Sequence, residues 1–346
     1  MASTRWKWLD CDSKSQNTKY IRELRPTKEE NTANRSALGK IVHVVHQHVK
    51  VTRGIPVKFI KVCGSDGKKT DVHKSSDLDL VVHVEGLEPE DMPERIGSIL
   101  LDIRDALDAQ FPGTRDTDWY QKFGLRYRIS GMEIDVLIGS PDVHPKDFLS
   151  VLDVLQSAYM SASVSRYSTN FMKKQSPCFK DLVRVVKDWR DSYANWPDQC
   201  KPKSYLLEVL LLHACKEAAP KLFLSRRCIW GMHGLHLTEN LANDVLVHFF
   251  RMIGDIPRYQ KGQTYDKDTV SIRAIFYTYY QESDIPLDTP EPLFQKSIRK
   301  KNAPDKIRHA SCIALDPANP HNNLWLTLAT ANPFIDRAKA TYKQMS

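Results

Sequence analysis

The chain has 346 residues, of which 41% are hydrophobic, and a formal net charge of +8. This length and apolar content suffice for a substantial core, arranged as two lobes or as one large, elaborated domain. The basic balance favours a polyanionic partner without identifying it. No apolar run approaches the ~18 residues that a transmembrane helix needs, which argues against a membrane-spanning protein.

The chain contains seven cysteines, an odd number, scattered without a C-x-x-C pair. Free thiols in a reducing compartment are the simplest interpretation of this pattern. The polar start, 1–12, lacks the apolar run of a signal peptide. We therefore expect a cytoplasmic protein.

The first half of the chain has a mixed α/β pattern. Residues 1–30 are polar, with Trp6, Trp8 and Tyr20 as potential docking anchors. Apolar residues at helical spacing begin at Ala37 and end before Gly54, which predicts a helix there. The next patterns predict strands over 56–63, 78–84, about 124–130 and 133–138, with a helix over about 91–109 between them.

The second half, after Pro145, is mostly helical in pattern. Apolar positions recur with helical periodicity, and proline and charge clusters separate the segments. The predicted helices cover about 146–160, 168–193, 203–217, 236–253 and 268–281.

An acidic pair is the most informative feature of the first half. Asp77 and Asp79 begin an apolar strand, and residues i and i+2 of a strand point to the same face. Adjacent carboxylates repel unless a cation lies between them. Asp135, on a later strand, offers a third carboxylate, and three such groups can hold the pair of Mg²⁺ ions that nucleotidyl transfer uses. Glu133 shares the face of Asp135, but a salt-bridged surface glutamate is the favoured interpretation.

A candidate phosphate loop precedes the acidic pair. Gly64 and Ser65 follow the apolar run 57–62, and Lys68 and Lys69 come shortly after. A glycine lets backbone N–H groups approach a phosphate, and a serine hydroxyl adds a donor. The pattern is not a Walker A loop, because G-x-x-x-x-G-K-[ST] is absent.

A mixed sheet with Gly-Ser and Asp-x-Asp, joined to a helical lobe, resembles polymerase-β-type nucleotidyltransferases. The segments 171–175 and 182–189 resemble the spine helix of 2′-5′-oligoadenylate synthetases. Ser204-Tyr205 resembles the Ser-Tyr of cyclic GMP-AMP synthases, where oligoadenylate synthetases carry Gln-Tyr. Residues 315–320, with 323–325, resemble the C-terminal signature of oligoadenylate synthetases. The resemblance covers roughly residues 36–330 and places the chain among the animal cGAS-like receptors, on the oligoadenylate-synthetase-like branch.

The resemblance implies an α+β fold with a mixed sheet in a nucleotidyltransferase core lobe, 1–160, and a helical lobe, 161–346, joined by a long spine helix. No structural zinc is expected, because the zinc-ribbon cluster of cyclic GMP-AMP synthase is absent from this sequence. His213 and Cys215 lie in an apolar helix and are expected in the core.

The implied function is double-stranded-RNA-activated, template-independent synthesis of 2′-5′-linked nucleotide second messengers from ATP, GTP or other NTPs, in innate immune sensing and antiviral defence. A cyclic dinucleotide is the favoured product. A linear 2′-5′-oligoadenylate synthetase and a catalytically inactive RNA-binding protein are the alternatives. The C-terminal signature argues against a poly(A) or CCA-adding enzyme.

The resemblance also implies residue roles. Asp77, Asp79 and Asp135 would be catalytic and hold two Mg²⁺ or Mn²⁺ ions. The residues expected to bind the nucleotide are Gly64, Ser65, Lys68, Arg184, Lys187, Ser204 and Tyr205. Those expected to bind duplex RNA are Lys40, Lys50, Arg53, Lys58, Lys173 and Lys174.

Overall fold

The structure is a computed structural model of the whole chain. It describes residues 6–11, 13–74, 77–117, 123–149, 154–197, 199–218, 239–256, 271–272, 313–314, 316, 319, 324 and 328–346. Of the helices that the sequence predicts, the one over 268–281 falls almost wholly outside these residues. Its described part, Ser271–Ile272, is the short strand β5, which pairs with β6, Ile313–Ala314. The predicted helix is therefore wrong at these two residues.

The chain forms two compact units. One is contiguous and runs from Arg25 to Lys173, whereas the other combines Met1–Leu24 with Lys174–Ser346. The expected division lay at residue 160, with the N-terminus in the first lobe. The structure instead places the boundary at Lys173 and groups the first 24 residues with the helical unit.

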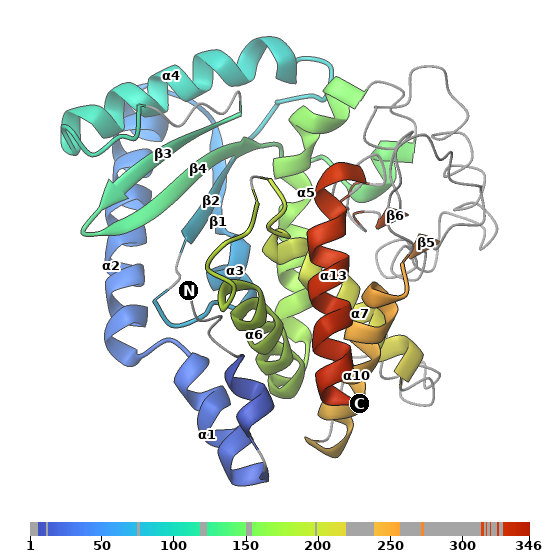
Figure 1. Cartoon of the computed structure of the whole chain (residues 1–346). Helices are drawn as coiled ribbons and strands as arrows, with labels where there is room; N and C mark the ends of the chain where they lie inside the picture. Colours follow the sequence, from blue (N-terminus) through green and yellow to red (C-terminus); the bar gives the residue numbers. More distant parts are fainter. Residues whose placement is uncertain are drawn as a thin grey trace. The chain divides into compact units, whose positions relative to one another are not determined.

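The contiguous unit is built on a four-stranded mixed sheet in the order β1-β2-β4-β3 (Figure 1). Its strands are β1, Val57–Val62, β2, Asp77–Val84, β3, Gly124–Ile129, and β4, Met132–Gly139. The central strands β2 and β4 run parallel, and the outer strands pair with them antiparallel. The strands predicted from the sequence are confirmed, and their even-numbered residues in β2 and β4 form the buried apolar face.

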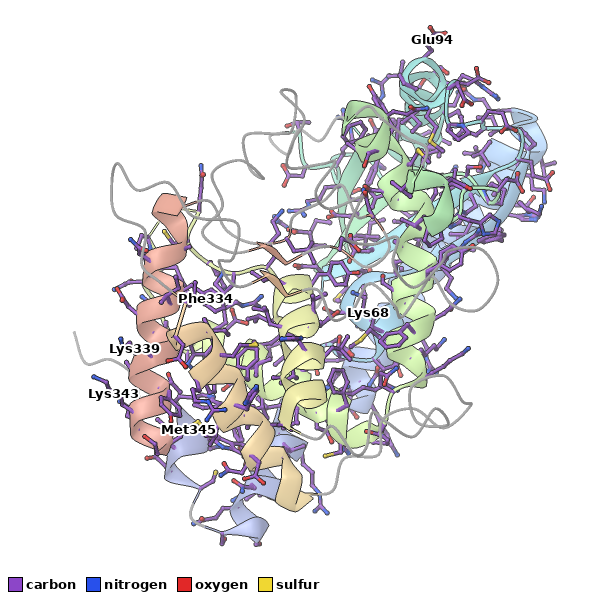
Figure 2. All side chains as sticks on the ribbon, turned by 90° about the vertical axis from the view of Figure 1, so that its right-hand side faces the viewer. Lys68, Glu94, Phe334, Lys339, Lys343 and Met345 are labelled. Carbon is purple, nitrogen blue, oxygen red and sulfur yellow. The ribbon has the colours of Figure 1, made fainter. Side chains whose placement is uncertain are left out.

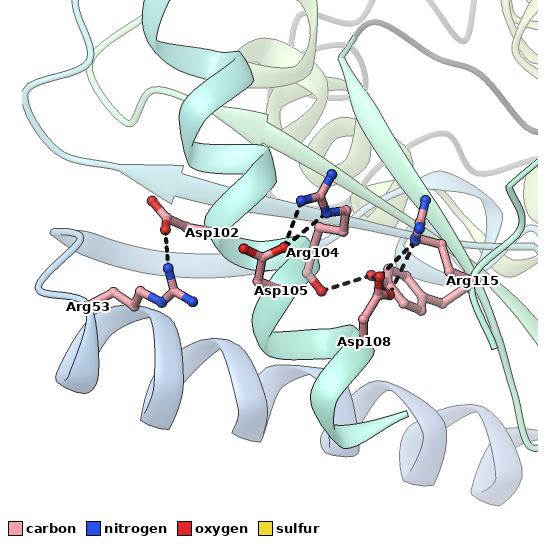
Figure 3. A network of polar contacts seen from close by, with 7 residues as sticks. Arg53, Asp102, Arg104, Asp105, Asp108 and Arg115 are labelled. Atoms are coloured by element: carbon pink, nitrogen blue, oxygen red, sulfur yellow. Dashed lines mark hydrogen bonds and ion pairs between the residues drawn. The ribbon is translucent and has the colours of Figure 1, made fainter. Parts of the chain in front are cut away.

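Helices cover both faces of this sheet. On the apolar face lies α4, Met92–Gln110, where Asp108 accepts hydrogen bonds from Tyr127 Oη of β3 at 2.8 Å and from Arg115 Nε at 3.0 Å (Figure 3). On the opposite face lies α5, Val154–Lys174. It packs so closely that a Cβ on Gly139 of β4 would stand 2.9 Å from the backbone of Ser163. The same face carries the acidic side chains described below.

Helix α2, Lys28–Val44, packs against α4, β2 and β4. It starts earlier than the apolar pattern predicts, because Thr27 and Glu30 form a reciprocal capping box at its N-terminus. It continues as a π-helical segment, η2, Val45–Thr52, so the predicted end near Gly54 is confirmed.

The expected continuous helix over 168–193 is wrong. The structure has two helices, α5 and α6, Pro177–Asp191, separated at Gln175–Ser176. Pro177 lacks the N–H that a helix interior requires and suits a first helical position, while Ser176 caps the new helix by accepting from Phe179 N at 3.2 Å. This break lies next to the boundary between the two units.

The helical unit has a strongly aromatic core. Trp189 of α6 is fully buried and donates from Nε1 to Thr341 Oγ1 at 2.9 Å. Its ring lies 4.9 Å from Phe250 and 6.0 Å from Phe334, measured between centroids. Figure 2 shows Phe334 turned toward the neighbouring helices and Lys343 on the outer side of the same helix. The α-helices described in this unit are α1, Lys14–Leu24, α6, α7, Ser204–Ala218, α10, Glu239–Gly254, and α13, Leu328–Met345.

The N-terminal segment belongs to this core. Trp6 is buried with its ring 5.5 Å from Phe250, and Trp8 is buried beside Tyr20. Tyr20 Oη donates a hydrogen bond to Asp188 of α6. These aromatic residues therefore anchor the first residues of the chain within the helical unit.

The described cysteines are free thiols, as the sequence predicts; they are Cys11, Cys63, Cys178, Cys200 and Cys215. None of the described helices has the length and apolar content required to cross a membrane.

His83 makes the stability of the contiguous unit depend on pH. It is fully buried on β2, its Nδ1 lies 3.2 Å from Ser140 O, and burial lowers its pKa from 6.5 to about 4. Because the unfolded chain takes up this proton first, the free energy of unfolding should fall by up to about 3 kcal/mol as pH drops from 6.5 to 4. In urea unfolding followed by circular dichroism, His83→Gln should lose less stability than the wild type over this range. Identical pH slopes would contradict the assignment.

Candidate active site

Four carboxylates gather on the face of the sheet opposite α4. The parallel register of β2 and β4 places Asp77 directly beside Glu133 and Asp79 directly beside Asp135. All four side chains point to the same face, because they occupy alternating positions of their strands. The structure therefore brings together the three carboxylates that the sequence predicts and adds Glu133 beside them.

Strand β3 supplies cations to the same face. Arg126 grips both oxygens of Asp135, with Nε 2.6 Å from Oδ1 and Nη2 2.8 Å from Oδ2. Its third nitrogen, Nη1, lies 2.7 Å from Glu133 Oε1, and Arg128 Nη2 lies 3.3 Å from Glu133 Oε2. The interpretation of Glu133 as a salt-bridged residue is confirmed. Arg126 is a site residue that the sequence motifs did not indicate, although its alternation with Arg128 on a predicted strand was a usable signal.

Asp79 carries the strongest electrostatic perturbation of the site. Burial of its carboxylate and the neighbouring charge of Asp135 raise its pKa to about 6, against the lowering effect of Lys68. Asp77 adds further repulsion. A cation placed between these groups would relieve that repulsion.

Gly64 makes room for the Asp79 carboxylate. It begins the short helix α3, Gly64–Lys68, with φ +55°. A Cβ at this position would stand 1.8 Å from Asp79 Oδ2. The backbone N–H of Cys63 donates to Asp79 O at 2.8 Å and fixes the two segments together. The nearby Asp79 carboxylate therefore requires a glycine at position 64. The sequence had suggested a different reason, the approach of a phosphate to the backbone.

The remaining loop residues lie on or just after α3. Lys68 is buried, 6% exposed, and its charge lowers the pKa of Asp79 (Figure 2). Ser65 is in the first turn of α3, and Lys69 ends the helix with φ 63°. Gly64, Ser65 and Lys68 thus lie next to the β2 carboxylates within one unit.

The donor atoms suit Mg²⁺, because all of them are carboxylate oxygens and Gly64 keeps space around one of the groups. Across the described part of the chain, however, no three His, Cys, Asp or Glu side chains are arranged to hold a metal ion. The chemistry of these oxygens therefore fits Mg²⁺, but the side chains do not converge on one point. Arg126 engages both oxygens of Asp135.

The expected triphosphate-binding residues of α6 belong to the helical unit and form internal ion pairs. Arg184 Nη1 lies 2.9 Å from Asp181 Oδ1, one turn earlier in the same helix. Lys187 Nζ lies 3.0 Å from Glu208 Oε1 of α7, and both side chains are at most 3% exposed. These pairs stabilise the charges of the two cations inside the helical unit.

Two motifs that are far apart in the sequence meet through a hydrogen bond. Tyr205 Oη donates to Asp316 Oδ1 at 2.8 Å, and Ser204 Oγ accepts from Arg190 Nη1 at 2.9 Å. Asp316 is 9% exposed. The Ser-Tyr motif at the start of α7 is therefore joined to the C-terminal signature, and Asp316 is a residue whose role the sequence pattern alone did not reveal.

The basic residues expected to bind RNA are exposed, and several have surface partners. Lys40 Nζ donates to Ser130 Oγ at 3.1 Å, and Arg53 Nη1 lies 2.6 Å from Asp102 Oδ1 (Figure 3). Lys58 Nζ lies 3.5 Å from Oε1 of Glu85, which follows β2. Exposed pairs of this kind contribute little free energy and exchange readily with other anions. The other three are also exposed: Lys50 on η2, and Lys173 and Lys174 at the end of α5.

Glu30 links helix α2 to the segment that precedes β2. Its Oε2 accepts from Thr27 N at 2.8 Å and lies 2.8 Å from His73 Nδ1. Its Oε1 accepts from Lys74 N at 3.0 Å. The N-terminus of α2 and the connection between α3 and β2 are therefore held by one carboxylate.

No family model matches the chain. Among solved structures, CdnC of E. coli MS115-1 in complex with HORMA-deltaN is similar, with a TM-score of 0.55, 15% identity, and 95% of each chain covered. A mutant of the Cid1 poly(U) polymerase bound to MgATP has a TM-score of 0.56 at 15% identity, covering 96% of this chain and 93% of that one. A cytoplasmic RNA terminal U-transferase has a TM-score of 0.55 at 14% identity, covering 99% and 92%. These similarities confirm the expected α+β nucleotidyltransferase fold.

Gly64→Ala should disturb the site through a clash. The added Cβ would displace the Asp79 carboxylate. Alanine is also disfavoured at a positive φ, which lowers the free energy of unfolding by about 1 kcal/mol. Gly86→Ala is the matched control, because Gly86 has φ +63° and open space around its Cβ position. Urea unfolding should show a larger loss of stability for Gly64→Ala than for Gly86→Ala. Equal losses would show that the carboxylate does not need this space.

Proposed function

We propose that the chain is a metal-dependent nucleotidyltransferase. The observation that carries this proposal is the pairing of Asp79 with Asp135 on parallel strands, with Gly64 against the Asp79 carboxylate. Asp77 and Asp79 would hold the two divalent ions, Mg²⁺ or Mn²⁺, and these would stabilise the charge that develops on the α-phosphate and the leaving pyrophosphate. Asp135 completes the site and accepts the proton of the attacking hydroxyl.

Two groups of residues are proposed to bind the nucleotide donor, one on α3 and one at the start of α7. Ser65 Oγ and the N–H of Gly64 donate to the triphosphate, and Lys68 adds positive charge. Tyr205 stacks on the base, and an aromatic face accepts any base. Its hydrogen bond to Asp316 supports this role, because it fixes the ring.

Arg184 and Lys187 are proposed to contact the triphosphate as well, and Ser204 to contact the nucleotide. For Lys187 this requires that the phosphate competes with Glu208, because the two side chains form a buried ion pair. Removing one partner of such a pair is strongly destabilising. The role of Lys187 is therefore best examined in a variant that also replaces Glu208 by an apolar residue.

The proposed product is a 2′-5′-linked second messenger, a cyclic dinucleotide, made in the cytoplasm in response to duplex RNA as part of innate immune sensing. The motifs around Ser204-Tyr205 and residues 315–320 support this assignment, and so does the set of exposed basic residues. Phosphate contacts of that kind read duplex RNA without sequence preference. Glu30 supports an effect of RNA on catalysis, because it ties α2 to the segment before Asp77.

A second candidate function is transfer of nucleotides to an RNA 3′ end. The likeness to the Cid1 poly(U) polymerase and to the terminal U-transferase favours it. A linear 2′-5′-oligoadenylate synthetase is the third candidate. An inactive RNA-binding protein is opposed by the presence of Asp77, Asp79 and Asp135.

Labelled NTPs, singly and in pairs, distinguish these functions. The protein is incubated with Mg²⁺, with and without duplex RNA whose 3′ ends are blocked, and products are treated with linkage-specific nucleases. We expect a small 2′-5′-linked product that requires the blocked duplex. Asp77→Asn should reduce it at least about a hundredfold, whereas Asp105→Asn, on the exposed surface of α4, should not.

The alternatives give different results in the same assay. Extension of unblocked RNA, with no small product from blocked RNA, supports 3′-end transfer. Equal turnover with and without duplex contradicts activation by RNA. Full activity of Asp77→Asn contradicts the metal assignment.

Tyr205→Ala and Tyr205→Phe separate stacking from hydrogen bonding. Loss of a stacked base costs about 1–3 kcal/mol, so the alanine variant should raise KM for the NTP about tenfold or more. The phenylalanine variant keeps the ring and loses only the hydrogen bond to Asp316, so KM should change less. Equal KM values for the two variants would show that the hydroxyl, rather than the ring face, is what matters.

A further inference from the structure

Arg126 is shared between two carboxylates with different roles. Its Nε and Nη2 hold both oxygens of Asp135, and its Nη1 holds Oε1 of Glu133. The contact is sheltered, since the side chains are 21% exposed for Arg126 and 15% for Asp135. A bidentate, charge-assisted pair of this kind is among the stronger polar interactions in proteins.

This arrangement opposes the assembly of a metal site. A divalent ion between Asp79 and Asp135 needs an oxygen of Asp135, and the guanidinium group both occupies those oxygens and repels the ion. Across the described residues, no three acidic or other ligating side chains converge on one point. Asp79 and Asp135 are nevertheless neighbours in the sheet register. The two strands thus already place Asp79 beside Asp135. For a metal site to form, only the Asp135 side chain would have to change direction.

Glu133 gives Arg126 a second position. It lies two residues before Asp135 on the same face and already contacts Nη1. Arg128, the next cation on β3, holds the other oxygen of Glu133 at 3.3 Å. A movement of Arg126 away from Asp135 would therefore leave it paired through Glu133.

We propose that Arg126 is a positioning residue that competes with divalent metal ions for Asp135, and that it stays paired with Glu133 when Asp135 turns to the ions. This rests on the proposed function of Asp135 as a metal ligand.

Binding of Mn²⁺ to the nucleotide-free full-length protein tests this, with free Mn²⁺ measured by electron paramagnetic resonance. Arg126→Lys is the decisive variant, because it keeps the positive charge but loses the bidentate fork. We expect it to bind Mn²⁺ about tenfold tighter than the wild type, the scale on which partners of metal ligands act. Affinity equal to or weaker than wild type would overturn the proposal.

Two further variants separate restraint from a general effect of charge. Arg128→Gln removes a cation from the same strand that is 66% exposed and pairs with Glu133, so Mn²⁺ affinity should stay within about twofold of wild type. Glu133→Gln weakens the second position of Arg126, so Mn²⁺ affinity should fall. Strengthening by Arg128→Gln as large as that by Arg126→Lys would show a field effect and overturn the restraint.

Asp79→Asn and Asp135→Asn distinguish a failure of the proposed metal site from a failure of the proposed role of Arg126. If both lose Mn²⁺ binding while Arg126→Lys binds as the wild type does, the metal site stands and the role of Arg126 fails. If neither loses Mn²⁺ binding, the proposed metal site itself fails. Circular dichroism of each variant confirms that the strands are retained, and Arg126→Gln provides a second variant if Arg126→Lys does not fold.

Discussion

Asp79 and Asp135 lie side by side on parallel strands, and their repulsion has to be balanced by the groups around them. The sheet register fixes the pair, so neither carboxylate can be moved apart without breaking the central β2–β4 ladder. Burial of Asp79, and after it the charge of Asp135, raise the pKa of Asp79. The charges of Lys68 and Arg126 reduce the electrostatic cost of ionising Asp79. A glycine stands at position 64 because the Asp79 carboxylate needs the space that a Cβ would fill.

This balance explains why the site has cations of its own. Carboxylates this close to one another repel, and cations among them relieve the repulsion. Lys68 and Arg126 are such cations, and the charge of each lowers the pKa of Asp79. In the proposed metal site, an ion would compete with Arg126 for the oxygens of Asp135.

The sequence was informative where periodicity and chemistry coincide, as in the alternating acids of β2 and the apolar residues of α4. The sequence was uninformative where a contact depends on which distant segments lie next to each other. The contact between Arg126 and Asp135 requires the register of β3 against β4, and the contact between Tyr205 and Asp316 joins residues 111 positions apart. The break before α6 was predictable in principle from Pro177, but the strong apolar periodicity on both sides concealed it.

The grouping of the first 24 residues with the helical unit has a consequence for biosynthesis. The unit from Arg25 to Lys173 is continuous, so all of its strands have left the ribosome while much of the remaining chain is still untranslated. The segment that carries Trp6 and Tyr20 is synthesised before that unit, but it cannot complete its packing until Asp188 and Phe250 have emerged. Its aromatic rings therefore lack their partners in α6 and α10 during this interval of translation, and exposed apolar surface of this kind favours aggregation.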